Sequence, residues 1–358
     1  MRFLLKTDYR QDLRLAARPR QGLWYGLLLV LALLAPAWAS AYWVTQLGFV
    51  LVYAIAGLGL MLLAGYAGLI SIGHAAFLGI GAYAQAWLVA HGWPFPLALA
   101  AAALLSGLAG VVVGLPALRV RGIYLAIATL AFGFIVEEVL ARWESVTGGN
   151  AGMPVQPPTL AGVSVAGPAG FYYLALAVCV LVTLGLLNLL RSPTGRAFIA
   201  VRDSEISAQS MGIQLARYKT LAFALSAAIV GIAGGLYAHL LNFISPEQFG
   251  IGQSIDLLLL VVVGGLGSVH GAFFGALFLI MMPQGIALAK DWLPPAIGQA
   301  SGLQAVVYGV VLMGFVLFEP MGLYGRWLKI RTYLELFPFY RQGMFRRQKA
   351  FQKSERLR

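Results

Sequence analysis

The feature that most limits the fold of this 358-residue chain is a long stretch without charge. From Gln21 to Leu118 there is no Asp, Glu, Lys or Arg. A transmembrane helix needs about 20 apolar residues, so this stretch is long enough for about four spans. Over the whole chain 60% of residues are hydrophobic and 11% are charged, against about 25% charged in soluble domains. We therefore predict an all-α fold, a polytopic transmembrane helical bundle, and exclude a soluble or nucleic-acid-binding protein.

Apolar runs recur along the rest of the chain and indicate about eight to ten spans, including re-entrant segments. The run at 255–267 is short and ends in glycines, which is typical of a half-span or a re-entrant segment. The runs lie at 22–40, 44–66, 74–91, 95–117, 123–141, 171–190, 220–241, 255–267, 270–288 and 302–318.

The basic residues predict the orientation, because cytoplasmic loops carry an excess of Lys and Arg. A ten-span path that starts inside places every basic residue except Arg142 and Lys290 on one face. The predicted parts are a basic cytoplasmic N-terminus at 1–21, a transmembrane domain at 22–325 with a cytoplasmic loop at 191–219 and an outside loop at 142–170, and a basic cytoplasmic tail at 326–358. Aromatic residues interleave the tail's charges, which favours contact with membrane lipid over docking on a partner protein.

The chain carries no catalytic signature. No lysine follows a glycine, as a P-loop requires, and no two histidines have the spacing of a zinc helix. The single cysteine, Cys179, excludes an intramolecular disulfide. We therefore expect neither an enzyme nor a cofactor or metal site in this chain.

The loop at 191–219 is the most informative segment. Its mixed charge predicts two short helices, with Ser204 as an N-cap and Gly212 in the turn that follows. Its apolar residues Ile206, Met211 and Ile213 have no core of their own to enter. The loop is therefore either a solvated connector or a segment that docks on a partner.

Glu205-Ile206-Ser207-Ala208 followed by Gly212 resembles the EAA loop of ABC importer permeases. The wider chain is similar to the branched-chain amino-acid (LivM-like) permeases of that class, with blocks in the same order. The similar blocks are GYAGLISIGHAAFLGIGAY (65–83), LRVRGIYLAIATLAFGF (118–134), TGGNAGMP (147–154), GRAFIAVRDSEISAQSMGIQLARYKTLAFALSAAIVGIAGGLYA (195–238), ISPEQF (244–249), GGLGSVHGAFFGALF (264–278) and FEPMGL (318–323).

The resemblance implies the permease subunit of an importer in the bacterial inner (plasma) membrane. Its implied partners are a second homologous permease, two ATP-binding cassette subunits that bind the ATP, and an extracytoplasmic substrate-binding protein. The loop would be the coupling helix that docks on the ATPase, through Glu205, Ile206, Ala208 and Gly212.

Branched-chain amino acids are the cargo that the resemblance implies. Urea, short amides, or aromatic and other small carboxylates remain alternatives, because related permeases share the same blocks. This chain also has Phe134 where the family often has a glutamate, so a pathway residue has changed. A stand-alone channel or carrier would need ionisable residues deep in the spans, and Asp256 is the nearest case.

Six polar residues in or near the spans are candidates for the translocation path, although each also has a structural explanation. The acids near the end of the fifth run could instead pair with Arg142, and the histidine could be satisfied by hydrogen bonds within the core. The candidates are Ser71, His74, Tyr124, Thr129, Glu137 and Glu138.

The sequences at 68–71 and 265–268 are alike, Gly-Leu-Ile-Ser and Gly-Leu-Gly-Ser, and both precede a histidine, an alanine and a phenylalanine. This is either a short internal repeat, as transporters often have, or chance.

Overall fold

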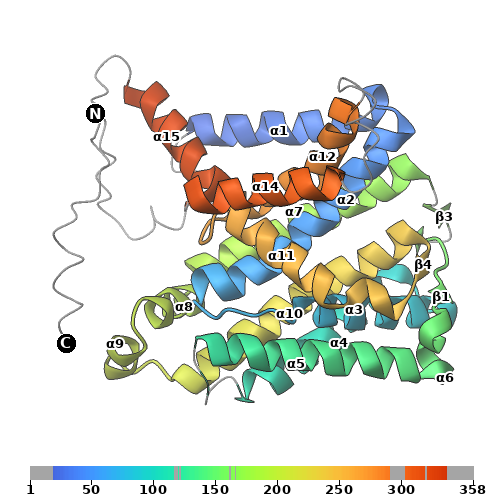
Figure 1. The fold of residues 1–358 in the computed structure, drawn as a ribbon, viewed down its shortest axis with the longest axis horizontal. Coiled ribbons are helices and arrows are strands. Elements are labelled where there is room, and N and C mark those ends of the chain that lie inside the picture. Colours follow the sequence, from blue (N-terminus) through green and yellow to red (C-terminus); the bar gives the residue numbers. More distant parts are fainter. Residues whose placement is uncertain are drawn as a thin grey trace.

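The computed structural model of the chain describes residues 19–116, 120, 122–160, 163–165, 167–290, 303–318 and 321–336. The described residues are mostly helical (Figure 1). The α-helices are α1 (Pro19–Trp38), α2 (Ala41–Leu60), α3 (His74–Ala90), α4 (Phe95–Gly114), α5 (Ile123–Arg142), α6 (Glu144–Thr147), α7 (Pro168–Arg191), α8 (Pro193–Asp203), α9 (Glu205–Ser210), α10 (Leu215–Leu241), α11 (Ile251–Gly264), α12 (Val269–Lys290), α14 (Leu303–Phe318) and α15 (Gly322–Leu336).

Shorter elements complete these helices. A π-helical turn, η2 (Met61–Tyr66), continues α2, and 3-10 turns form η4 (Gly149–Ala151) and η5 (Pro246–Phe249). Four two-residue strands are β1 (Met153–Pro154), β2 (Thr159–Leu160), β3 (Val163–Ser164) and β4 (Phe243–Ile244).

Every predicted apolar run coincides with a helix, which confirms the polytopic all-α bundle. Seven described helical segments are long and apolar enough to cross a membrane, and Gly22–Trp38 is a shorter apolar helix. The run predicted as a half-span is α11, whose 14 residues extend about 21 Å. This is shorter than the ~30 Å hydrocarbon core, and η5 lengthens the segment to the 19 residues Pro246–Gly264.

The helices lie in layers with their ends gathered on two sides (Figure 1). The helices α8 and α9 lie at one end, on the left of Figure 1, and β1, β3 and β4 lie at the other. We call these the α8–α9 end and the strand end. The strands pair antiparallel, β1 with β4 and β2 with β3. The sequence predicted only an outside loop at 142–170, because two-residue strands are too short to show an alternating pattern.

The core lies where α10 packs against α4, α3 and α2. In the apolar stretch formed by α2 and η2, 78% of the residues are buried inside the protein, and in that of α10 the share is 67%. In α5 and α7 the share is only 22% each. Small residues allow this close contact, as in other membrane helices. A Cβ atom at Gly234 would overlap the carbonyl oxygen of Leu78, and one at Gly110 would lie 2.6 Å from the Cβ of Ala227.

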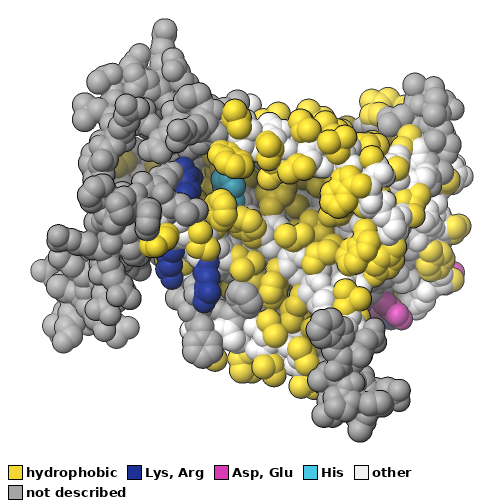
Figure 2. Space-filling view, turned by 90° about the horizontal axis from the view of Figure 1, so that it is seen from above, with side chains coloured by type: hydrophobic (Ala, Val, Ile, Leu, Met, Phe, Trp, Pro, Cys, Tyr) yellow, Lys and Arg dark blue, Asp and Glu magenta, His cyan; other side chains and the backbone are white. Residues whose placement is uncertain are grey.

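The outward faces of the peripheral helices are apolar. Leu28 of α1 is 64% exposed and Ile135 of α5 is 61% exposed. Figure 2 shows hydrophobic side chains over most of the described surface of one face, with charged groups toward its edges. In water such a surface would associate, whereas in a bilayer it faces lipid or another subunit. The predicted basic segments at 1–18 and 337–358, and Arg119 and Arg121, lie outside the described residues.

Candidate functional site

The predicted coupling loop folds as the two short helices α8 and α9, as the sequence indicated. The Ser192 hydroxyl accepts a hydrogen bond from the Gly195 amide and begins α8, with Pro193 at its first position. The Ser204 hydroxyl accepts one from the Ser207 amide and begins α9. Gly212 follows with φ +83°, a backbone conformation that side chains disfavour. Local capping chemistry therefore fixes the shape of this segment.

A buried ion pair attaches α9 to α10. The Nζ atom of Lys219 lies 2.6 Å from Oε1 of Glu205, and the Lys219 side chain is only 3% exposed. Two charges that share a largely buried position stabilise each other, and removing one leaves the other uncompensated. Glu205 therefore faces the permease itself.

The other side of α9 is open and exposes two large apolar side chains. Ile206 is 79% exposed and Met211, directly after the helix, is 85% exposed, while Ala208 is 3% exposed. Apart from Gly212 and its two chain neighbours, no atom of the described residues lies within 4 Å of a Cβ placed on Gly212. Of the predicted coupling residues, Glu205 and Ala208 therefore face inward, and Ile206 and Gly212 lie on the accessible side.

Three of the predicted path residues meet in one buried hydrogen-bond network. His74 Nδ1 lies 2.8 Å from the Ser71 hydroxyl, and His74 Nε2 lies 2.9 Å from the Ser226 hydroxyl. The Ser226 hydroxyl donates to the Gly59 carbonyl, so it accepts from Nε2–H, and Nδ1 accepts from Ser71. The Ile72 amide donates to Thr129 Oγ1, which brings α5 into the network.

This network joins α2, α3, α5 and α10 at the beginning of α3. Ser71, His74 and Thr129 are each at most 1% exposed, and the Ser254 hydroxyl of α11 accepts from the next amide, that of Ala75. Their hydrogen bonds satisfy them within the core. The sequence interpretation that the histidine is held by hydrogen bonds is therefore the one that this geometry supports.

The other three candidates lie apart from that network on α5. Tyr124 is 70% exposed, and Glu138 forms an ion pair with Arg142 within the helix. Glu137 faces α11, because a Cβ at Gly250, the residue before α11, would lie 3.1 Å from both of its carboxylate oxygens. A carboxylate near a helix N-terminus is favourable, so Glu137 complements α11.

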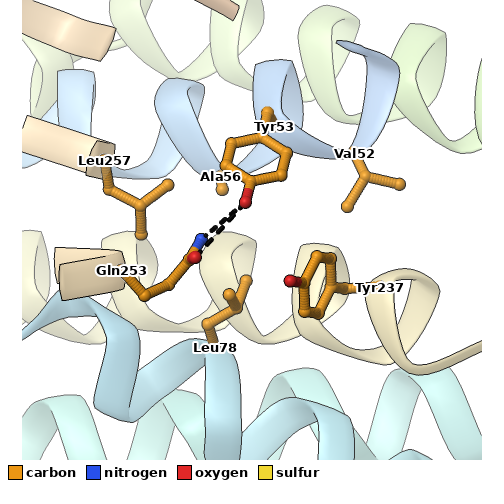
Figure 3. A pocket seen from close by; sticks show the side chains of 7 residues that line it. All are labelled: Val52, Tyr53, Ala56, Leu78, Tyr237, Gln253 and Leu257. Atoms are coloured by element: carbon orange, nitrogen blue, oxygen red, sulfur yellow. Dashed lines mark hydrogen bonds between the residues drawn. The ribbon is translucent and has the colours of Figure 1, made fainter. Parts of the chain in front are cut away.

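A crevice between α2, α3, α10 and α11 combines apolar and polar groups (Figure 3). Its side chains pack closely, so the space between them is too narrow to hold a water molecule. The Tyr53 hydroxyl lies 3.3 Å from Gln253 Oε1 and 3.0 Å from Gln253 Nε2, so the two side chains bridge α2 and α11. Its lining consists of Val52, Tyr53, Ala56, Leu78, Tyr237, Gln253 and Leu257.

Sequence reasoning missed the polar lining of this crevice. Tyr53 and Tyr237 lie within apolar runs, where tyrosine is common, and Gln253 lies before the run at 255–267 that we predicted as a half-span or re-entrant segment. Only the packing of α2 on α11 reveals that these side chains meet.

The family described as "Branched-chain amino acid transport system / permease component" matches residues 42–318, which include the crevice, the buried network and α8–α9. The chain belongs to this family. No solved structure matches the chain significantly.

Relatives agree with this membership in the permease family. The chain is 36% identical over 329 residues to the "High-affinity branched-chain amino acid transport system permease protein LivM" of Escherichia coli, covering 85% of this chain and 75% of that protein. It is 28% identical over 248 residues to the "Autoinducer 2 import system permease protein LsrC" of Enterobacter sp., covering 68% of each. It is 27% identical over 232 residues to the "Probable branched-chain amino acid transport permease protein LivM" of Methanocaldococcus jannaschii, covering 63% of this chain and 67% of that protein.

Proposed function

We propose that this permease is the membrane-spanning subunit of an ABC importer that takes up branched-chain amino acids. The support for this cargo is the 36% identity to a permease named for it, against 28% to one named for autoinducer 2. Urea, short amides and aromatic or other small carboxylates are the alternative cargoes within the same machinery. The chain itself would bind no cofactor, since ATP would be bound by the partner subunits.

The single observation that carries the transport mechanism is the two-sided character of α9. Its inner side is attached to α10 through Glu205 and Lys219, while Ile206 and Met211 present an apolar surface on the other side. A helix that is firmly held and apolar outward is suited to docking in a groove of a partner. The partner that we propose is an ATPase subunit, with the α8–α9 end facing the cytoplasm.

The complete assembly that we propose has this chain, a second homologous permease and two ATPase subunits. A binding protein would deliver the cargo at the strand end, outside the cell. ATP binding and hydrolysis in the partners would then move α9 and alternate access to the path. A stand-alone channel or carrier has less support, because it leaves the exposed side of α9 without a role.

We place the translocation path next to the crevice of Figure 3. Its aliphatic lining with a few hydroxyl and amide groups matches an amino acid with an apolar side chain. Ser71, His74 and Thr129 would act from the buried network, by positioning the beginning of α3. Tyr124, Glu137 and Glu138 remain candidates for the outer part of the path.

The experiment that tests this function is a mild-detergent purification of the tagged chain from its native membranes. Co-purification of two P-loop ATPases and a second permease is the expected result. The associated binding protein would then be titrated with leucine, urea and an aromatic acid, and tight binding of leucine alone is expected. A chain that purifies without ATPases and still conducts its cargo would contradict the importer.

A further inference from the structure

Two glycine-rich turns meet at the α8–α9 end, and they are the two segments that are alike in sequence. One turn follows η2 and leads toward α3, and the other joins α11 to α12. A Cβ at Gly65 would lie 2.6 Å from the Gly267 nitrogen, and the Gly267 amide donates to Met61 Sδ over 3.1 Å. The turn between α11 and α12 therefore touches η2 directly before the other turn begins, backbone against backbone.

Arg202, near the end of α8, lies against both turns. Its Nη1 donates to the Gly65 carbonyl over 3.0 Å. A Cβ at Gly68 would lie 2.8 Å from the Arg202 Cγ, and one at Gly267 would lie 3.6 Å from its Nη1. Gly68 and Gly267 have φ of +72° and +83°, so both turns depend on glycine in the positions that face this arginine.

A second contact fixes the orientation of the guanidinium group. Asp203 Oδ1 accepts from Arg202 Nε over 2.9 Å and from Nη2 over 2.8 Å. Such a two-point contact holds the planar group in one plane and leaves Nη1 directed at the Gly65 carbonyl. Lysine, with a single ammonium group, cannot make both contacts in this geometry.

Arg202 lies close to α9 in the chain and also contacts the core. Asp203 and Ser204 alone separate it from the beginning of α9, so a displacement of α9 reaches Arg202 through a short, capped connection. Beyond the Gly65 carbonyl, the chain continues through Ser71 to His74 and the buried network. Arg202 thus connects α8 to η2 by a hydrogen bond and packs against Gly68 in the turn that leads to α3.

We propose that Arg202 is a positioning residue that transmits the movement of α9 to the two turns, and through them to α3 and α12. This inference rests on the proposed function, in which an ATPase moves α9. Arg202 touches neither cargo nor ATP, so its loss should separate ATP hydrolysis from uptake rather than abolish either binding event.

The test uses the full complex, reconstituted in vesicles with its binding protein, and compares wild type with R202Q, R202K and D203N. Each variant is measured for subunit stoichiometry, ATP hydrolysis and leucine uptake. We expect R202Q to assemble and to hydrolyse ATP at half the wild-type rate or more, while uptake per ATP falls at least tenfold. R202K and D203N should show smaller losses of uptake per ATP. R217Q, which removes an exposed arginine of α10 away from both turns, should keep the wild-type ratio.

If the wild-type complex takes up leucine and R202Q has the same uptake per ATP, the role of Arg202 is overturned while the proposed function stands. If R202Q does not assemble, the leucine uptake per ATP of R202K and D203N decides the question. A wild-type value in both variants overturns the inference. Wild-type vesicles without ATP-dependent uptake would overturn the proposed function, and this inference with it.

Discussion

At the scale of single residues, the ion pair between Glu205 and Lys219 decides which side of α9 faces the core. Lys219 is almost completely buried, and Glu205 is the acid that compensates its charge. The glutamate of the EAA-like segment therefore acts within the permease, by holding α9, while its neighbour Ile206 is exposed. Glu205 and Ile206, which are adjacent in α9, therefore face different sides of the helix.

Replacing Glu205 with Gln should destabilise the chain by about 3 kcal/mol, because it leaves the buried Lys219 charge uncompensated. Lys219→Met should cost less, since the Glu205 side chain is 24% exposed and that of Lys219 only 3%. The double variant should lose less stability than the two single losses added together. Thermal unfolding of the purified chain in detergent measures all three. Strictly additive losses would show that the two charges do not interact.

Met211→Asp should weaken ATPase binding at least tenfold, which is about 1.4 kcal/mol. Met211 is 85% exposed, so the change should leave the stability of the chain within about 0.5 kcal/mol. Co-purification of the ATPase and thermal unfolding are the two measurements. Gln209→Asp, which adds the same charge at an exposed polar residue of α9, is the matched control. Equal ATPase binding in both variants would argue against docking through this apolar side.

At the scale of elements, the close contact of α3 with α10 holds the centre of the bundle together. Gly110 and Gly114 of α4 lie against α10, as small residues do where membrane helices pack closely. The approach is closer still at Gly234, where α10 meets the backbone of α3 at Leu78. Tertiary packing selects which of the many glycines are indispensable.

Gly234→Ala should destabilise the chain by about 3 kcal/mol, because the added methyl group would force α3 and α10 apart. Gly185→Ala in α7 is the matched control, since no atom lies within 4 Å of a Cβ there. That change should be neutral or stabilise the chain by up to about 1 kcal/mol through helix propensity. Unfolding temperatures in detergent compare the two, and similar values would contradict the packing of Gly234.

At the scale of the whole molecule, the proposed docking surface on α9 and the crevice lie in different parts of the bundle. The exposed residues of α9 lie at the α8–α9 end, and the crevice lies among α2, α3, α10 and α11. Arg202 binds the Gly65 carbonyl, and the chain leads from Gly65 through Ser71 to His74 and the buried network. In the proposed mechanism, a movement of α9 would reach the buried network by this route.

Gln253→Leu should lower leucine uptake about tenfold in the reconstituted complex, because it removes the amide that bridges to Tyr53 in the crevice. The binding protein should keep its affinity for leucine, and the ATPases should remain attached. Gln284→Leu on α12, outside the crevice lining, is the control and should keep its uptake. Equal uptake by both variants would place the path elsewhere.

Much of the architecture could be predicted from residue patterns. Apolar runs predicted the helices, and Ser204 and Gly212 predicted the limits of α9, because capping and left-handed turns depend on only a few neighbouring residues. The candidate site was predicted less completely. Ser71, His74 and Thr129 were selected as polar residues in spans, but which of them meet depends on helices that are far apart in the sequence.

Hydrophobicity thus sufficed to predict the membrane fold, and sequence motifs sufficed for the resemblance to the permease family and for the limits of α9, since each depends on residues close together in the chain. Tertiary packing alone determined that Glu205 faces Lys219, that Tyr53 meets Gln253, and that Arg202 reaches the Gly65 carbonyl. The physical reason is the same in each case. A buried polar group must find a partner, and only the arrangement of the helices decides which partner is within reach.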